Sequence, residues 1–216
     1  NRATSALYAP GSTFKIVTLS GLLENNVATP ETQVDAPASV DIGNAKVTND
    51  DGAEYGSVSL KRATEVSSNT AFAKLGVQLG ADKLVKTSEA FGFNKSFGGF
   101  ELPVTTSLMP NPSVMTEWET AWASAGQPVG EHPGSPAGPQ ATVLQMALVG
   151  SAVANDGVLQ KPYLVDGVYN AKGERSYTAT HSAMSTVMSK QTADEVTDVL
   201  EGVVDEGTGY GASIRG

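Results

Sequence analysis

The sequence contains no cysteine and only two histidines, His132 and His181. The lack of cysteine excludes disulfide bonds, thiolate metal sites and a cysteine nucleophile. The two histidines lie far apart in the chain, and neither has a partner residue at metal-ligand spacing. We therefore interpret both as solvated surface side chains and predict neither a metal site nor a cofactor.

Positive charge and long apolar runs are also scarce. Lysine and arginine number 14 against 23 acidic residues, which gives a net charge of -9. No basic run is present to neutralise phosphates, so nucleic acid is excluded as an expected partner. No window approaches the roughly 18 apolar residues of a membrane-spanning helix, and no signal peptide is visible. Since 40% of the 216 residues are hydrophobic, we expect one domain over residues 1–216 with a sizeable core.

Helical periodicity and helix-ending residues predict five helical segments. Their ranges are 12–26, 59–80 (interrupted at residues 67–69), 81–91, 142–155 and 189–206. The fourth has almost no charge and is expected to be buried on most sides, whereas the fifth is amphipathic, with Val196, Val199, Leu200 and Val203 facing inward.

The remaining segments are rich in strand and turn residues. Residues 32–58 indicate a short hairpin, with Asp51-Gly52 as its turn, and residues 158–175 indicate a second pair of strands. The turn of the second pair lies at 166–167 or at 171–173. Residues 94–140 form a Gly- and Pro-rich stretch that is too long for an idle connection, so a functional or lid-like role is expected. The pattern indicates an α+β fold or a mainly helical lobe.

A serine and a lysine stand three residues apart in LYAPGSTFKIVTL, where the first helix is predicted to begin. Ser12 and Lys15 would then share one helix face, with the serine near the positive end of the helix dipole. The lysine is flanked by Phe14, Ile16 and Val17, and desolvation lowers the pKa of a lysine towards the working pH. A neutral lysine can accept the proton of a neighbouring serine, so the pair suits acyl transfer without a histidine.

Ser-x-x-Lys also arises by chance about once in a chain of this length. The alternative interpretation is a helix cap at Ser12 and a lysine that extends to solvent. Ser67-Ser68-Asn69, the only Ser-x-Asn in the sequence, interrupts an otherwise apolar helical run. Unpaired polar groups are costly in such a place, and here a serine could relay a proton while the asparagine amide holds a substrate carbonyl. An ordinary helix cap at Ser67 or Ser68 is the alternative.

Together, the Ser-x-x-Lys and Ser-x-Asn motifs resemble those of the penicillin-binding proteins and serine β-lactamases. NRATSALYAPGSTFKIVTLSGLLE is similar to the region around the nucleophile of the monofunctional (class B) penicillin-binding transpeptidases, and EVSSNTAFAKLGVQLG to their second-motif helix. ATVLQMALVGSAVANDGVLQKPYLV is similar to the run before their third motif. The resemblance covers nearly the whole chain and is weakest between residues 92 and 119.

The resemblance implies an α+β fold of the penicillin-binding protein and serine β-lactamase type, with the helical lobe largely present and the central antiparallel sheet incomplete. It implies that Ser12 attacks a D-alanyl-D-alanine or β-lactam carbonyl to form an acyl-enzyme, and that Lys15 is the general base. Ser67 would carry a proton to the leaving amine, and Asn69 would bind a substrate amide. The backbone N–H of Ser12 would form half of an oxyanion hole.

Two departures from the family pattern stand out. The third motif, Lys-Thr-Gly, is missing: Lys86-Thr87-Ser88 lies in a helical pattern, and Gly207-Thr208-Gly209 lacks the cation. VVDEGTGYGASIRG resembles the segment just before that motif, so we expect an excised or truncated chain that stops a few residues short of it. Gly126-Gln127-Pro128 replaces the usual Gly-Gln-Gly and begins a Gly- and Pro-rich insert that reaches Gln140.

The resemblance therefore implies a D,D-transpeptidase domain that cross-links peptidoglycan stem peptides and binds β-lactams covalently. The parent protein would be anchored at the extracytoplasmic face of the bacterial membrane, in a cell-wall synthesis complex. Whether the chain is active without the third motif stays open, and a non-catalytic β-lactam sensor or scaffold is the alternative. A β-lactamase fits less well, because the related class resembles Ser-x-Val at the second motif. An incomplete sheet would expose an edge, so we also expect association by strand exchange.

Overall fold

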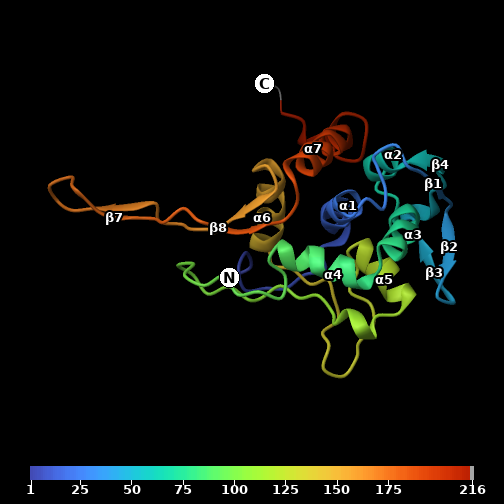
Figure 1. Cartoon of the computed structure of the whole chain (residues 1–216), viewed down its shortest axis with the longest axis horizontal. Helices are drawn as coiled ribbons and strands as arrows, with labels where there is room; N and C mark the ends of the chain where they lie inside the picture. The colour runs from blue at the N-terminus through green and yellow to red at the C-terminus, as the bar shows by residue number, and fades with distance from the viewer. Residues whose placement is uncertain (215–216) are drawn as a thin grey trace.

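One helix, α1 (Lys15–Glu24), lies near the centre of the protein (Figure 1). It contacts α3 (Asn69–Leu79), α4 (Ala81–Ala90), α6 (Val143–Ala154) and α7 (Lys190–Asp205). A helix surrounded in this way must be apolar on nearly all sides, and eight of its ten residues are buried. Because this central helix begins at Lys15, the lysine lies in the interior of the protein.

The computed structural model describes residues 1–214, and the last two residues of VVDEGTGYGASIRG lie outside them. The shorter helical elements are η1 (Gly11–Phe14), η2 (Asp50–Gly52), α2 (Leu60–Glu65), η3 (Pro112–Val114), α5 (Glu117–Ser124) and η4 (Tyr210–Ala212). No helix formed by the described residues is both long and apolar enough to cross a membrane.

The strands among the described residues form four two-stranded antiparallel sheets. The pairs are β1 (Gln33–Ala36) with β4 (Gly56–Ser59), β2 (Ser39–Ile42) with β3 (Ala45–Thr48), β5 (Val158–Gln160) with β8 (Ala183–Thr186), and β6 (Gly167–Tyr169) with β7 (Arg175–Thr178). The expected α+β class is thus confirmed. The single domain over residues 1–216 stays a prediction.

The five predicted helical segments are all present. The polar interruption at residues 67–69 separates α2 from α3, and the Ser68 hydroxyl accepts a hydrogen bond from the Ala71 amide at 3.2 Å as the cap of α3. Ser189 caps α7 in the same way by accepting from Thr192. Such caps satisfy backbone donors that have no partner within the helix, which explains why these serines mark the helix starts.

The first hairpin turns at a different place from the one predicted. Strands β2 and β3 are joined at Gly43-Asn44, whose φ angles are +58° and +65°. Glycine and asparagine tolerate this left-handed region, which tight hairpin turns require. Asp51-Gly52, the predicted turn, instead belongs to η2 beyond the hairpin. The prediction of the turn was wrong because Gly43-Asn44 and Asp51-Gly52 are both turn-forming pairs, lie close together in the chain, and the second pair was chosen.

Helix α5 was not predicted from the sequence pattern, although residues 94–140 contain a recognisable start signal. Thr116 and Glu119 form a capping box, in which each side chain accepts a hydrogen bond from the backbone N–H of the other residue. Helix α6 was also misjudged, because only one of its faces is buried and Val143 is 54% exposed. Its exposed face consists mainly of small uncharged residues. The absence of charged residues therefore did not show that the helix is buried on most sides.

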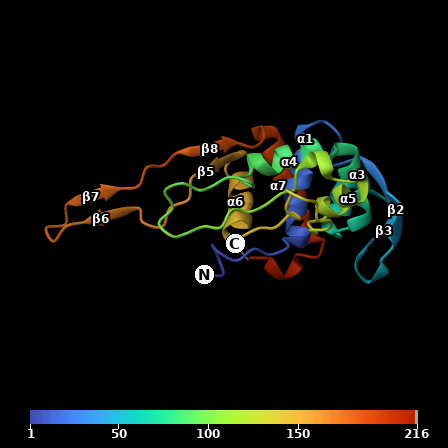
Figure 2. The same ribbon diagram turned by 90° about the horizontal axis from the view of Figure 1, so that it is seen from below.

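Strands β6 and β7 form a long hairpin that projects away from the helices (Figure 2). Its turn lies at residues 171–173, which decides between the two turns allowed by the sequence. Val168, Tyr169 and Tyr177 are exposed on this arm at 47%, 60% and 48%. The active-site candidates all lie in the helical body rather than on the arm.

Candidate active site

Ser12 lies in η1, the tight turn that leads into α1. Gly11 before it has a φ of +55°, and its N–H donates to the Gly126 carbonyl at 3.0 Å. The residues that precede η1 and α1 are Pro10 and Phe14, and neither helix start is capped by a side chain. The interpretation of Ser12 as a helix cap is therefore wrong, and its exposed hydroxyl is free to make other contacts.

Lys15 is buried, with 3% of its surface exposed, and does not extend to solvent. Its Nζ lies 3.0 Å from Ser12 Oγ, 2.9 Å from Ser67 Oγ, 2.8 Å from the Ser67 carbonyl and 2.8 Å from Asn69 Oδ1. Desolvation by burial lowers the lysine pKa from 10.5 to about 8, and the negative charge of Asp50 partly opposes this shift. At a pKa of about 8, roughly a tenth of Lys15 is neutral at pH 7.

Ser67 completes a triangle with the other two groups. Its hydroxyl donates to Ser12 Oγ at 2.9 Å and lies 2.9 Å from Lys15 Nζ. Ser67 has a φ of +57°, a left-handed conformation that is uncommon for a serine. Because the break between α2 and α3 imposes this turn, the hydroxyl faces α1 and does not cap α3; Ser68 serves as the cap.

Asn69 is the first residue of α3, and both ends of its side-chain amide contact protein groups. Oδ1 accepts from Lys15 Nζ at 2.8 Å, whereas Nδ2 donates to the Thr48 carbonyl at 3.1 Å and to Asp50 Oδ1 at 3.3 Å. The four residues chosen from the sequence are thus brought together, although positions 12 and 69 lie on different helices. The geometry allows proton transfer among two hydroxyls and an amine.

Asn49, which was not predicted to be part of the site, fixes the position of the second-motif segment. Asn49 is 4% exposed, and its Oδ1 accepts hydrogen bonds from Ser68 Oγ and from the Thr70 amide, at 3.1 and 3.0 Å. Its Nδ2 donates to the carbonyls of Pro37 and Ala53. An asparagine in Thr48-Asn49-Asp50 looks like an ordinary turn residue in the sequence, and its contacts across 21 positions depend on the tertiary fold.

A cavity of about 230 Å³ opens beside the triangle. Its lining includes Ser12, Lys15 and Ser67 together with the apolar side chains of Leu200 and Val203 from α7. The sequence periodicity predicted that both α7 residues face inward but gave no sign that they border the serine. The cavity thus combines hydroxyl and amine groups with an apolar lining.

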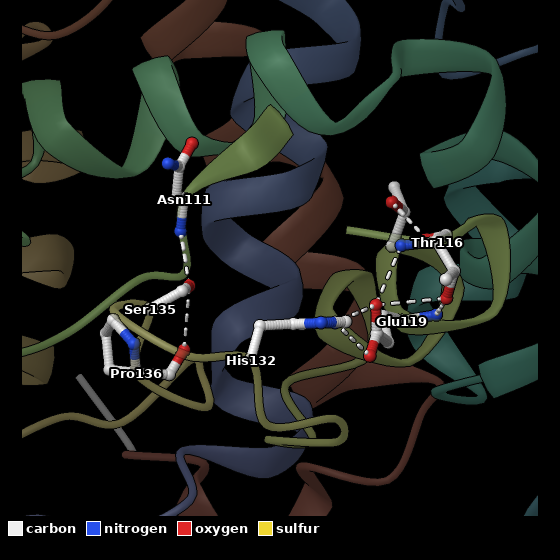
Figure 3. Close-up of polar contacts among 7 residues, drawn as sticks. Asn111, Thr116, Glu119, His132, Ser135 and Pro136 are labelled. Carbon is white, nitrogen blue, oxygen red and sulfur yellow. Dashed lines mark hydrogen bonds and ion pairs between the residues drawn. The ribbon is translucent and has the colours of Figure 1, made fainter. Parts of the chain in front are cut away.

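A buried carboxylate, that of Glu119, fixes the loop after α5 (Figure 3). Glu119 accepts hydrogen bonds from the Thr116 amide at 2.7 Å and from His132 Nε2 at 2.8 Å. Further along, Ser135 Oγ accepts from the Asn111 amide at 2.8 Å. Since Gly126 in the same loop bonds Gly11, these contacts connect α5 to the turn that carries Ser12.

The histidines differ from the prediction in one case. His132 is only partly exposed and is bonded to Glu119, so its interpretation as a solvated side chain was wrong. The His181 side chain is 62% exposed and lies 3.4 Å from Asp166. Within residues 1–214, no group of three or more histidine, aspartate or glutamate side chains is arranged to hold a metal ion.

Comparisons of the sequence and of the structure with known proteins point to the same protein family. The family model described as "Penicillin binding protein transpeptidase domain" matches residues 1–216. A curated relative, peptidoglycan D,D-transpeptidase PbpA of Mycolicibacterium smegmatis, is 33% identical over 205 residues, which cover 93% of this chain and 39% of the relative. Stage V sporulation protein D of Bacillus subtilis is 32% identical, over 97% of this chain and 31% of its own length. The chain thus spans about two fifths or less of these relatives.

Two solved structures have the same fold. The D,D-transpeptidase domain of a peptidoglycan glycosyltransferase from Eggerthella lenta superimposes with a TM-score of 0.96 and 56% identity, over 100% of this chain and 53% of that chain. Penicillin-binding protein A of M. tuberculosis, solved as an imipenem acyl-enzyme complex, superimposes with a TM-score of 0.86 and 29% identity, over 99% of this chain and 47% of the other.

Proposed function

The chain belongs to the penicillin-binding protein transpeptidase domain family, and from this premise we propose that it carries the acylation site of a peptidoglycan D,D-transpeptidase. Ser12 is the nucleophile, Lys15 the proton acceptor, Ser67 the proton relay and Asn69 a residue that binds the substrate amide. The substrate is a stem peptide that ends in D-alanyl-D-alanine, and β-lactams acylate the same serine. The protein acts on peptidoglycan outside the cytoplasm, as a membrane-anchored member of a cell-wall synthesis complex.

The proposed reaction begins with the transfer of a proton to Lys15. Neutral Lys15 takes the proton of the Ser12 hydroxyl while Oγ attacks the carbonyl carbon, and negative charge develops on the carbonyl oxygen. When the C–N bond breaks, the leaving amine receives the proton from Lys15 through the Ser67 hydroxyl. An acyl ester on Ser12 remains. The amine of a second stem peptide then attacks this ester and regenerates the serine.

The observation that carries the proposal is the triangle of Ser12 Oγ, Ser67 Oγ and a buried lysine amine, in which each pair lies 2.9–3.0 Å apart. Proton transfer needs donor and acceptor at hydrogen-bond distance. A lysine with a pKa of about 8 also holds its neutral form at an appreciable fraction near neutral pH. The acyl-enzyme complexes of M. tuberculosis penicillin-binding protein A support the same chemistry for this chain.

Intact-mass spectrometry after incubation with a penicillin tests the proposal. We expect the mass of the protein to increase by that of one penicillin, and the Ser12→Ala and Lys15→Arg variants to show no increase. Ser57→Ala, an exposed serine on β4, is the matched control and should be acylated like the wild type. The same measurement on a chain extended past Gly216 reports whether further residues are needed.

Absence of an adduct on both the chain and its extended form would contradict the enzyme proposal and favour the scaffold alternative. An adduct combined with no cross-linking of stem peptides by the extended form would favour the β-lactam sensor.

A further inference from the structure

Asp50 lies beside the site but has no part in the mechanism above. It is the first residue of η2, directly after buried Asn49, and its side chain is exposed. Asp50 Oδ1 accepts from Asn69 Nδ2 at 3.3 Å, and Asn69 Oδ1 accepts from Lys15 Nζ at 2.8 Å. A carboxylate, an amide and an amine thus form one chain of contacts that ends at the proton acceptor.

The carboxylate determines which way the amide points. An asparagine side chain donates from one end and accepts at the other. The Nδ2 end faces two acceptors, the Thr48 carbonyl at 3.1 Å and Asp50 Oδ1. Reversing the amide would place its oxygen against these acceptors and its NH₂ against the lysine donor. The observed orientation is therefore favoured at both ends, and Asp50 adds a charged acceptor to it.

The charge of Asp50 also acts on Lys15. Burial disfavours the ammonium form, and the nearby carboxylate favours it, so these opposing effects together place the lysine pKa at about 8. Two charged side chains on the helices next to the site have partners of their own: Glu65 of α2 pairs with Arg62, and Lys74 of α3 pairs with Asp35. Since Asp50 is exposed, its effect should weaken as salt is added.

We propose that Asp50 is a positioning residue of the acylation step, which holds the Asn69 amide towards Lys15 and keeps a negative charge beside the lysine. The proposal rests on the proposed role of Lys15 as proton acceptor. The carboxylate acts through these two residues and needs no contact with the substrate. It shifts the pH range in which Lys15 can accept the serine proton to higher values, against the larger effect of burial.

Three variants separate the charge from the hydrogen bond. Asp50→Asn keeps an oxygen that can accept from Asn69 but removes the charge, whereas Asp50→Ala removes both. Asp51→Asn is the matched control, because Asp51 is an exposed acidic residue of the same turn with a φ of +52°, which asparagine tolerates. We would follow the titration of Lys15 by NMR of its ¹³Cε, assigned with Lys15→Arg. The rate of acylation by a fluorescent penicillin would be measured from pH 6 to 10, a range chosen to bracket the lysine titration.

For Asp50→Asn we expect the Lys15 titration and the rising limb of the rate profile to move to lower pH together. Loss of a neighbouring opposite charge then raises the acylation rate at pH 7 roughly twofold, and the difference from wild type shrinks at high salt. Asp50→Ala should show the same displacement and also a lower rate on the high-pH plateau, because the Nδ2 end of the amide is then held by the Thr48 carbonyl alone. Asp51→Asn should superimpose on the wild type.

An Asp50→Asn protein with an unchanged Lys15 titration would overturn the proposal, as would an equal displacement in Asp51→Asn. A slower acylation with no change in the titration would mean that Asp50 contacts the reagent, and would equally contradict a positioning role. If even the wild type is not acylated, the proposed function fails. The NMR titration needs no acylation, so it still decides whether Asp50 acts on the lysine.

Discussion

At the residue scale, Lys15 shows how the site and the stability of the protein oppose each other. Burying an amine disfavours its protonated form, and the negative charge of Asp50 only partly offsets this cost, since the pKa still falls to about 8. The same burial produces the neutral amine that the proposed acylation requires. The residue that destabilises the fold at neutral pH is thus the one that would activate Ser12.

The stability of the protein should therefore depend on pH through Lys15. Between pH 8 and 10.5 the unfolded lysine still binds a proton that the folded one has lost, so the free energy of unfolding rises with pH. The full shift corresponds to about 3 kcal/mol. Urea denaturation at several pH values should show this rise relative to Lys15→Met. Lys74→Met, a lysine paired at the surface with Asp35, should retain it, and equal pH dependence in wild type and Lys15→Met would contradict the expectation.

At the element scale, α5 and the loop that follows it pack against α1 and the turn that carries Ser12. The Thr18 hydroxyl of α1 donates to the Ser124 carbonyl at 2.9 Å, and Gly126 accepts from Gly11 at 3.0 Å. Gly126 has a φ of +85°, and a Cβ there would lie 1.9 Å from the Gly11 carbonyl oxygen. Only glycine fits at this contact, so the end of α5 and the turn before Ser12 behave as one packed unit.

Glu119 stabilises the start of α5. Replacing it should therefore destabilise both α5 and the turn before Ser12, which pack together. Although desolvation raises the Glu119 pKa, hydrogen bonds from Thr116 and His132 outweigh it and lower the pKa below its usual value. The carboxylate therefore stabilises the fold above its unfolded pKa, and this contribution is lost as the pH falls through the folded pKa. We expect Glu119→Gln to reduce the free energy of unfolding at pH 7 by about 1–2 kcal/mol.

Urea denaturation at pH 7 and at acidic pH measures this effect, and the difference between wild type and Glu119→Gln should shrink as the solution becomes acidic. Glu117→Gln is the control, because Glu117 lies in the same first turn of α5 but is exposed. A Glu119→Gln protein as stable as Glu117→Gln at pH 7 would show that the carboxylate is not needed.

At the scale of the whole molecule, the helices are well enclosed, whereas the sheets are small. Every sheet among the described residues has two strands, and isolated pairs of strands are marginally stable in water. The β6–β7 arm exposes apolar side chains and leaves the outer edge of each strand unpaired within residues 1–214. Exposed edges of this kind are templates for pairing with another chain.

We expect the chain to associate through such edges as its concentration rises. Sedimentation velocity should show a sedimentation coefficient that increases with concentration, and Val168→Lys on β6 should reduce the increase. Thr178→Lys adds the same charge at a polar position of the hairpin and should have a smaller effect. A sedimentation coefficient independent of concentration would count against association by strand exchange.

Much of the helical framework was predictable because its signals are local. Apolar spacing and capping serines marked the helices, and the break at Ser67-Ser68-Asn69 was visible as polar residues in an apolar run. Helix α5 was missed because its capping box lies inside a Gly- and Pro-rich segment. The turn at Gly43-Asn44 was missed because a second turn-forming pair, Asp51-Gly52, follows it closely. The contacts of Asn49, Asp50 and His132 carried no local signal, since each joins segments distant in the chain.

The amino-acid sequence alone shows which groups are available for chemistry: a serine and a lysine three residues apart, a Ser-x-Asn, and no cysteine. It also determined that the lysine begins an apolar helix. The packing of the helices brings Ser67 to 2.9 Å from Ser12, Asn69 into contact with Lys15, and Asp50 into contact with Asn69. Helix caps and periodicity depend on neighbours within a few residues, whereas distances across 50 positions depend on how the helices pack.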